Sequence, residues 1–281
     1  MSEAASFQKT FFGNYELERE LGQGGMGTVY LARDTGLNRK VALKILREDL
    51  GTDPGFTEKF LEEVEVTASL AHPNIIRVYT LGEQHGRLYL VMEHLDLPSL
   101  EQRMDREGKI PEQDVLEVGI GIASALQFAY DQTGLIHRDI KPGNILFGRG
   151  NIPKLADFGL AAGARSALGL QDEIWGTPYY VSPERLSREE EDIRSDIYSL
   201  GATLYHALSG RPPFEAPTAE EVAQRHLLDR PAPLRSVCPN AHPQTIDSIE
   251  RALQKNPRSR WQDYAEMISF SADARRRLTS E

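Results

Sequence analysis

The sequence has 281 residues, of which 40% are hydrophobic and 26% are charged, and this balance is typical of a globular protein with a buried core. The formal net charge of −10 argues against binding to nucleic acid, because such binding depends on Lys and Arg side chains that neutralise phosphates. The one cysteine, Cys238, excludes an internal disulfide, and the sequence shows neither a signal peptide nor an apolar run near the roughly 20 residues of a bilayer span. We therefore expect a cytoplasmic segment that itself contacts neither membrane nor nucleic acid.

The segment that precedes Met92 has the pattern of β-strands with one helix among them. Runs of β-branched and aromatic residues alternate with turn-forming stretches such as 22–27. Phe60 and Val64 recur at helical spacing opposite an acidic face, which predicts a helix at 56–70. The expected strands are 15–21, 28–32, 40–46, 75–81 and 88–92.

After His94 the pattern changes from strands to helices. Pro111 opens a long helix in which Val115 and Ile122 fall on one face, and a second helix at 197–208 is apolar on most sides. Further helices are expected at 218–228, 244–253 and 261–277, with a proline-rich loop at 229–243. These patterns predict an α+β protein with two lobes, a small antiparallel β-lobe with one main helix and a larger α-helical lobe. A cleft between such lobes is a favoured place for a ligand.

A glycine-rich motif of the form GxGxxG is made by Gly22, Gly24 and Gly27. Glycines allow the backbone to approach phosphate oxygens without obstruction by a Cβ atom. A dinucleotide-binding motif would require a helix after the glycines, whereas Thr28 and Val29 begin a strand-like run. The motif therefore predicts a hairpin that covers a nucleotide.

Several motifs follow in an order that resembles the eukaryotic-type protein kinase family, and its bacterial serine/threonine members in particular. They are the V-A-L-K run that ends at Lys44, the H-R-D-I-K-P-G-N run from His137 to Asn144, the D-F-G run that begins at Asp157, and the S-P-E run that ends at Glu184. The resemblance covers nearly the whole chain. It implies an N-terminal extension at 1–13 and a kinase domain at 14–278, with a small lobe at 14–93, a hinge at 94–98 and a large lobe at 99–278.

The resemblance implies the catalytic roles. Asp139 would accept the proton of the substrate hydroxyl, and Lys141 would neutralise the γ-phosphate and mark the serine/threonine class. Lys44 would bind the α- and β-phosphates, and Glu63 is its expected partner in place of Glu62 or Glu65. The full catalytic set is Lys44, Glu63, Asp139, Lys141 and Thr177.

The nucleotide and metal contacts are implied in the same way. Asn144 and Asp157 would hold Mg²⁺, or Mn²⁺ in its place, through oxygen ligands. Met92 would lie behind the adenine, and backbone groups of Glu93 and Leu95 would bond its edge. The residues expected to bind ATP are Leu21, Gly22, Gly24, Gly27, Val29, Ala42, Lys44, Met92, Glu93, Leu95 and Leu146.

Further residues have implied structural roles. Glu184 would form a buried ion pair with an arginine near the end of the chain, with Arg260 favoured over Arg258. Asp196 would tie the backbone of the catalytic loop to a buried helix, and it also has the pattern of an N-cap. His137 is expected to be scaffold and not a general base. Gly143 stands where glutamate is common in the family.

The control of activity is left open by the sequence. Arg138, beside Asp139, would bind an activation-loop phosphate. Ser166 is one candidate for that phosphorylation site, and a direct pairing of Arg138 with Asp172 or Glu173 is the alternative.

The activity implied is Mg²⁺-dependent transfer of the γ-phosphate of ATP to Ser and Thr hydroxyls of proteins. The alternative is a weakly catalytic pseudokinase or docking module, and rivals from other classes are a small-molecule phosphotransferase and a dinucleotide binder. The implied partners are ATP, protein substrates and a second copy of the chain for autophosphorylation. The segment would be cytoplasmic, alone or as the cytoplasmic domain of a membrane-anchored kinase.

Overall fold

The computed structural model describes residues 10–48, 54–158 and 178–279, which belong to two compact units. The described part of the first unit is 10–48, 54–69 and 76–94, and that of the second is 70–75, 95–158 and 178–279. Within these ranges we find no helix that combines the length and the apolar character needed to cross a bilayer.

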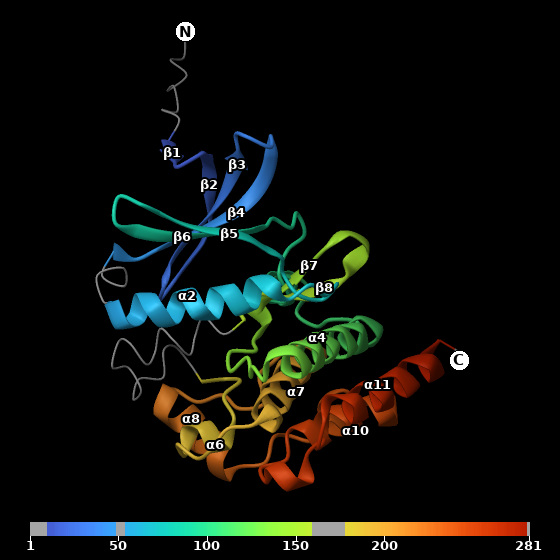
Figure 1. Cartoon of the computed structure of the whole chain (residues 1–281). Coiled ribbons are helices and arrows are strands. Elements are labelled where there is room, and N and C mark those ends of the chain that lie inside the picture. The colour runs from blue at the N-terminus through green and yellow to red at the C-terminus, as the bar shows by residue number, and fades with distance from the viewer. Residues whose placement is uncertain (1–9, 49–53, 159–177, 280–281) are drawn as a thin grey trace. The chain divides into compact units, whose positions relative to one another are not determined.

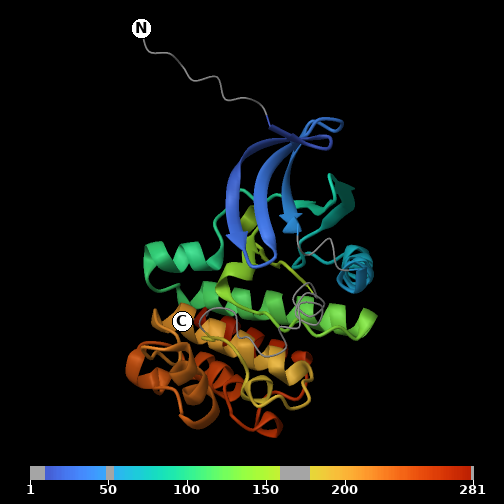
Figure 2. The same cartoon turned by 90° about the vertical axis from the view of Figure 1, so that its left-hand side faces the viewer.

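The first unit is built on an antiparallel sheet. In its described part, six strands lie in the order β1-β2-β3-β4-β6-β5, and every neighbouring pair is antiparallel (Figure 2). The strands are β1 (Thr10–Phe12), β2 (Tyr15–Gly24), β3 (Gly27–Asp34), β4 (Arg39–Leu46), β5 (Val78–Gln84) and β6 (Arg87–Glu93). The central strand β4 is buried from Val41 to Leu46 and contributes Val41, Leu43 and Ile45 to the core of the first unit.

Strand β1 was not expected from the sequence. Its three residues fall inside the segment predicted as an extension, and they pair with β2 through Phe12 and Tyr15. Phe12 is buried and its ring meets that of Tyr89 edge-on, with centroids 5.3 Å apart. A strand of three residues has too little alternation to be seen in a sequence, and here one aromatic side chain anchors it.

The main helix of the first unit is α2 (Pro54–Ser69), which packs along the sheet beside β5 (Figure 1). Phe60, Val64 and Thr67 are buried on one side of it, as their helical spacing predicts. Strand β5 begins at Val78 and not at Ile75, because Ile75 instead forms an isolated bridge to Leu155 in the second unit.

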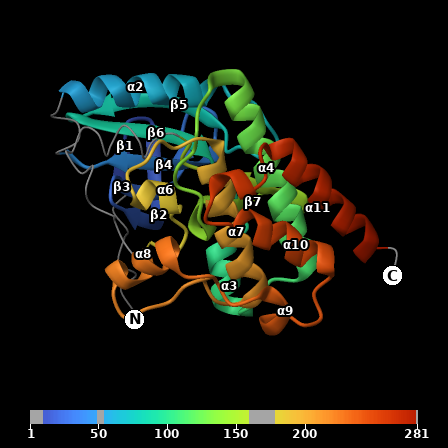
Figure 3. The same ribbon diagram turned by 90° about the horizontal axis from the view of Figure 1, so that it is seen from below.

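The second unit is mainly helical. Its helices are α3 (Leu100–Glu107), α4 (Glu112–Thr133), α6 (Pro183–Leu186), α7 (Ile193–Ser209), α8 (Ala219–Leu228), α9 (Leu234–Val237), α10 (Pro243–Ala252) and α11 (Tyr264–Leu278). Shorter elements are the turns η1 (Pro142–Asn144), η2 (Arg149–Asn151) and η3 (Pro257–Ser259) and the paired strands β7 (Ile145–Phe147) and β8 (Pro153–Leu155). Helix α7 is buried along most of its length, and α4 and α11 lie side by side (Figure 3).

These elements confirm the expected α+β class, with a small antiparallel sheet and one main helix in the first unit and a larger helical second unit. Three short helices were not expected, and one of them, α6, begins within the S-P-E run. Helix α3 is fixed by a capping box between Ser99 and Gln102, and α9 occupies part of the stretch predicted as a proline-rich loop.

Candidate active site

The glycine motif forms the tight hairpin between β2 and β3, with Gly24 directly opposite Gly27. A Cβ atom on Gly27 would lie 2.1 Å from the carbonyl oxygen of Ile45, so the fold itself requires glycine at that position. Among the described residues, no atom lies within 4 Å of a Cβ placed on Gly22 or on Gly24. The fold does not require glycine at these two positions, which leaves their backbone open to a close ligand.

Lys44 lies on β4 and its side chain is buried, with 6% exposed. It pairs in register with Val29 of β3, and Ala42 pairs with Met92 of β6. Directly paired residues share a face of a sheet, as do residues two apart on one strand, so Val29, Ala42, Lys44 and Met92 project from the same face. The structure thus brings four of the predicted nucleotide contacts together.

The predicted partner of Lys44 is not tested by the structure. Glu63 falls within α2, but its side chain lies outside the described residues. A buried ammonium requires a counter-charge or a bound anion. The pairing of Lys44 with Glu63 therefore stays a prediction.

The catalytic loop brings three predicted side chains together in the second unit. Lys141 Nζ donates to Asp139 Oδ2 at 2.8 Å, and Asn144 Nδ2 donates to the same oxygen at 3.1 Å. Asn144 Nδ2 also donates to the backbone oxygen of Asp139 at 2.8 Å. The Asp139 carboxylate is therefore aimed by a lysine and an amide, while 26% of its side chain stays exposed.

Asp196 supports this loop from α7. Its completely buried carboxylate accepts the backbone N–H groups of His137 at 2.7 Å and of Arg138 at 2.8 Å. Burial raises the pKa of Asp196, and the positive neighbours and the two N–H groups oppose that rise. The predicted tie is confirmed, whereas the N-cap interpretation is wrong: Asp192 is the N-cap of α7.

The loop conformation depends on this support. Arg138 has a φ of 67°, in the left-handed region that non-glycine residues rarely adopt. His137 is fully buried, bonds the carbonyl of Ala156 through Nε2 at 3.0 Å and meets the ring of Phe158 edge-on. His137 is scaffold, as predicted.

Asp157 and Asn144 lie at the same end of the β7–β8 pair. Asn144 comes just before β7, Asp157 follows β8, and the N–H of Ala156 donates to the Asn144 carbonyl at 2.9 Å. The amide nitrogen of Asn144 donates to Asp139, so the amide oxygen of Asn144 points away from Asp139. A carboxylate and an amide oxygen are ligands that Mg²⁺ accepts, and the phosphates of a nucleotide can complete its coordination. The residues present therefore fit a divalent metal.

The predicted regulatory contacts lie largely outside the described residues. Thr177, Ser166, Asp172 and Glu173 belong to that part of the chain. Arg138, in contrast, lies 3.9 Å from the carboxylate of Glu191, a pairing that the sequence did not predict.

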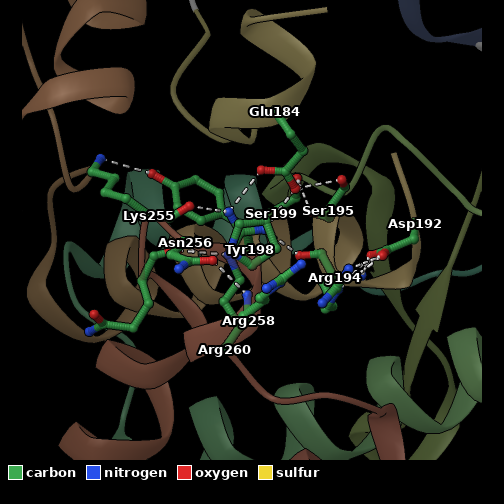
Figure 4. A network of polar contacts seen from close by, with 12 residues as sticks. Glu184, Asp192, Arg194, Ser195, Tyr198, Ser199, Lys255, Asn256, Arg258 and Arg260 are labelled. Carbon is green, nitrogen blue, oxygen red and sulfur yellow. Dashed lines mark hydrogen bonds and ion pairs between the residues drawn. The ribbon is translucent and has the colours of Figure 1, made fainter. Parts of the chain in front are cut away.

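A buried ion pair joins Glu184 of α6 to Arg260, and both side chains are labelled in Figure 4. Arg260 Nη1 and Nη2 donate to the two Glu184 carboxylate oxygens at 2.7 and 2.8 Å, and Ser195 Oγ donates to Oε1 at 2.6 Å. The remaining N–H groups of Arg260 reach three backbone carbonyls, those of Arg194, Gln254 and Lys255. All five donors of a guanidinium with no exposed area are thus satisfied.

This pair settles the choice of arginine, because Arg258 is exposed whereas Arg260 is buried. Burial alone would raise the pKa of Glu184, but the hydrogen bonds and charge of Arg260 outweigh it and hold the pKa below its usual range. The predicted pairing of Glu184 with Arg260 is confirmed.

The sequence analysis missed a polar chain that continues from this pair. The Tyr198 hydroxyl lies 2.8 Å from Nδ1 of His226. Lys255 Nζ donates to that hydroxyl at 3.4 Å (Figure 4). It also donates to the His226 carbonyl at 2.5 Å. Burial lowers the pKa of His226 to about 3, so its ring is neutral at pH 7. These residues are 28 or more positions apart, and no local spacing could have revealed them.

With this geometry in place, comparison with known proteins identifies the family. The model of the protein kinase domain matches residues 15–269, and the chain belongs to that family. It is 40% identical over 259 residues to the serine/threonine-protein kinase PknB of Mycobacterium leprae, covering 90% of this chain and 42% of that protein. For PknB of Mycobacterium tuberculosis the figures are 40% over 265 residues, 90% and 41%. A probable serine/threonine-protein kinase of Streptomyces coelicolor is 39% identical over 262 residues, with 91% and 39% covered. The chain thus spans about four tenths of the length of these relatives.

Proposed function

We propose that this chain transfers the γ-phosphate of ATP to serine and threonine hydroxyls of proteins, with Mg²⁺ as the bound metal. The observation that carries the proposal is the convergence of Lys141 and Asn144 on the carboxylate of Asp139. The backbone of this loop is fixed by two hydrogen bonds to the buried carboxylate of Asp196. The names of the relatives, which are serine/threonine-protein kinases, support the same substrate class.

The proposed chemistry needs alignment and charge neutralisation and little covalent work by the protein. Asp139 accepts the hydrogen of the substrate hydroxyl and directs its oxygen to the γ-phosphate. Lys141 places a positive charge where negative charge moves during transfer. Asn144 and Asp157 would hold Mg²⁺, which when bound would supply positive charge to offset that of the phosphates.

Most of the proposed nucleotide contacts come from the first unit, and two of them, Leu95 and Leu146, come from the second. The backbone of Gly22 and Gly24 approaches the phosphates, with Gly27 closing the hairpin. Lys44, held by Glu63, binds the α- and β-phosphates. The adenine contacts are Leu21, Val29, Ala42, Met92, Glu93, Leu95 and Leu146. Thr177 completes the catalytic set through hydrogen bonds to Asp139 and Lys141.

Three further points belong to the proposal. The domain runs from 14 to 278. The segment works in the cytoplasm, where ATP is supplied, either alone or as the cytoplasmic domain of a membrane-anchored kinase. A second copy of the chain serves as one of its substrates, so autophosphorylation occurs between copies.

The test is transfer of labelled γ-phosphate from Mg-ATP to a generic protein substrate, with Asp139→Asn as the critical variant. Loss of the carboxylate base should lower kcat by roughly 10²- to 10⁴-fold, the usual contribution of a positioned acid or base. Asp131→Asn, which changes an exposed aspartate at the end of α4, serves as the matched control and should retain full activity. Transfer that is equally fast in wild type and Asp139→Asn, or that is absent from wild type at every metal concentration, contradicts the proposal. Phosphopeptide mapping of the product identifies the residue class that is modified.

A further inference from the structure

The buried carboxylate of Asp196 has a third hydrogen-bond donor, which comes from the last helix of the chain. The hydroxyl of Tyr264, the first residue of α11, lies 3.4 Å from Asp196 Oδ2, and both groups are buried. The same oxygen accepts the N–H of His137 at 2.7 Å, and Oδ1 accepts the N–H of Arg138 at 2.8 Å. Asp196 therefore links α11 to the backbone of the catalytic loop.

The Tyr264 hydroxyl is the donor in this contact. Burial first, and then the charge of Asp196 and the hydrogen bond to it, raise the pKa of Tyr264 well above its ordinary value, and the charges of Tyr130 and Asp192 act in the same direction. The hydroxyl therefore keeps its hydrogen at pH 7. An ionised carboxylate carries no hydrogen of its own, so it can only accept.

The position of this hydroxyl is fixed by its helix. Asp263 caps α11, since its Oδ1 accepts from the N–H of Glu266 at 2.7 Å. The Tyr264 ring is 2% exposed and belongs to the hydrophobic core of the second unit, as does Met267 on the next turn. The phenol is thus held against Asp196 by packing, and its oxygen can be removed without any other change to the core.

The third donor matters because Asp196 has no exposed area. A buried carboxylate is costly unless its oxygens are hydrogen-bonded, and it must accept with both oxygens to hold the N–H groups of His137 and Arg138. The positive neighbours of Asp196 are these same two residues, and Tyr264 adds a donor from a different element. A hydroxyl on Oδ2 favours the ionised form of Asp196 and restricts rotation of its carboxylate.

The residue that depends most on this orientation is Arg138. Its φ of 67° is rare for a residue with a side chain, and the next residue in the chain is Asp139. A small rotation of the Asp196 carboxylate would release the N–H of Arg138 and change the direction of the Asp139 side chain. Misplacement of a reacting group by about 1 Å can lower a rate by about 100-fold, so even a modest loss of support should be measurable.

We propose that Tyr264 is a positioning residue for phosphoryl transfer, which acts through Asp196 to fix the backbone of the catalytic loop and so to direct Asp139 at the substrate hydroxyl. This inference rests on the proposed kinase function. Tyr264 is in the core and contacts Asp196, so its effect on the reaction passes through that carboxylate.

The first test is Tyr264→Phe, which removes one oxygen. The kcat for a peptide substrate should fall by roughly three- to tenfold, and the KM for ATP should stay as in wild type, because the nucleotide contacts are elsewhere. The matched control is Tyr205→Phe. Tyr205 is also buried in the second unit, but its hydroxyl donates to the carbonyl of Ala232 at 2.9 Å. This control should lower the melting temperature and leave kcat unchanged.

A double-mutant cycle tests whether Tyr264 acts through Asp196. When Asp196→Asn is already present, the carboxylate that Tyr264 orients is gone, so adding Tyr264→Phe should change kcat by less than about twofold. A role of Tyr264 in packing alone would lower kcat by the same factor in both backgrounds.

Amide hydrogen exchange gives a measurement that needs neither activity nor the Asp196 variant. The N–H groups of His137 and Arg138 should exchange roughly three- to tenfold faster in Tyr264→Phe than in wild type, because the carboxylate that accepts them is less firmly held. In Tyr205→Phe their exchange should match that of wild type.

The outcomes separate the inference from the function on which it rests. If Tyr264→Phe has the kcat and the exchange rates of wild type, the inference is overturned and the kinase function stands. Equal losses of kcat in Tyr264→Phe and Tyr205→Phe, or equal factors in the two backgrounds of the cycle, also overturn the inference. No phosphate transfer by wild type to any peptide or protein overturns the kinase function, and the inference with it.

Discussion

Two polar regions of the second unit use their charges in opposite ways. Around Arg260 every donor is satisfied and the guanidinium has no exposed area. In the catalytic loop, Lys141 and Asp139 are 44% and 26% exposed, and Arg138 has a left-handed backbone conformation. The first region is closed to solvent, whereas the second presents charges to it.

The difference shows how this unit divides stability from chemistry. A charge whose hydrogen bonds are all made within the protein stabilises the fold and has little capacity to bind a ligand. A charge that is aimed by its neighbours and still exposed can act on a substrate. Asp196 connects the two regions, because α7 carries it together with Ser195, which bonds Glu184. The predictions that follow test this division.

The largest effect is expected where the closed region is broken. Glu184→Ala leaves the Arg260 guanidinium buried and unpaired, and removal of one partner of a buried pair costs roughly 3–5 kcal/mol. Unfolding by urea, followed by circular dichroism, should show a loss of that size. Arg258→Ala, two residues before Arg260 and exposed, should change the free energy of unfolding by no more than about 0.5 kcal/mol. Equal losses in the two variants would contradict the assignment of the pair.

A smaller loss of stability with a larger loss of activity is expected at Asp196. Asp196→Asn turns an amide donor towards the N–H groups of His137 and Arg138, so at least one buried donor loses its acceptor. An unsatisfied buried group costs about 1–3 kcal/mol. Arg138 would then no longer be held in its left-handed conformation, and kcat should fall by at least about tenfold while the KM for ATP changes little. A variant that is less stable but has wild-type kcat would show that the loop does not need this support.

The sequence predicted the fold where a signal was long and periodic. Helix α4 and helix α7 have apolar residues over several turns, and burial follows that pattern. Strand β1 has three residues and helix α9 four, and both are held by tertiary packing, through Phe12 and Leu234, in segments that carry no periodic signal. Element length therefore decided what could be predicted.

The site was predictable for a different reason. Asp139, Lys141 and Asn144 lie within one short motif, and Glu184 and Arg260 were paired through the family resemblance. Contacts between distant elements without a motif were not predictable, such as Tyr198 with His226 and Glu101 with Gly143. In the second case the sequence shows glycine at position 143, but only the structure shows that the Glu101 carboxylate of α3 lies beside it.

Lys255, whose carbonyl accepts a hydrogen bond from Arg260, gives the division between the two regions a test by pH. Burial, helped by the positive charge of Arg260, lowers the pKa of the Lys255 ammonium to about 8, and the negative charge of Asp229 opposes that shift. An unfolded lysine titrates near 10.4, so between pH 8 and pH 10 the unfolded chain binds more protons and the free energy of unfolding rises with pH. Because Lys255 is only partly buried, we expect the rise to be about 1 kcal/mol.

The measurement is the pH dependence of urea unfolding for wild type and Lys255→Met. Other lysines and tyrosines titrate in the same window, so the difference between the two proteins carries the information. The wild-type curve should climb relative to the variant from pH 8 to pH 10. Parallel curves would mean that the hydrogen bonds of Lys255 to the carbonyls of Arg225 and His226 fully offset its burial.

The smallest effect is expected at the open region, in the pair between Arg138 and Glu191. The two charged groups are 3.9 Å apart and the arginine side chain is 36% exposed, so Glu191→Gln should change the free energy of unfolding by less than about 0.5 kcal/mol.

The effect of Glu191→Gln on kcat shows which negative group Arg138 needs for activity. Arg138 adjoins Asp139, so a carboxylate beside Arg138 can help to hold the loop as a phosphate would. A fall in kcat for Glu191→Gln that Glu190→Gln, an exposed neighbour, does not share would show that Glu191 supplies this charge. An unchanged kcat in both variants, together with loss of activity after phosphatase treatment of the wild-type protein, would show that Arg138 depends on a phosphorylated residue instead.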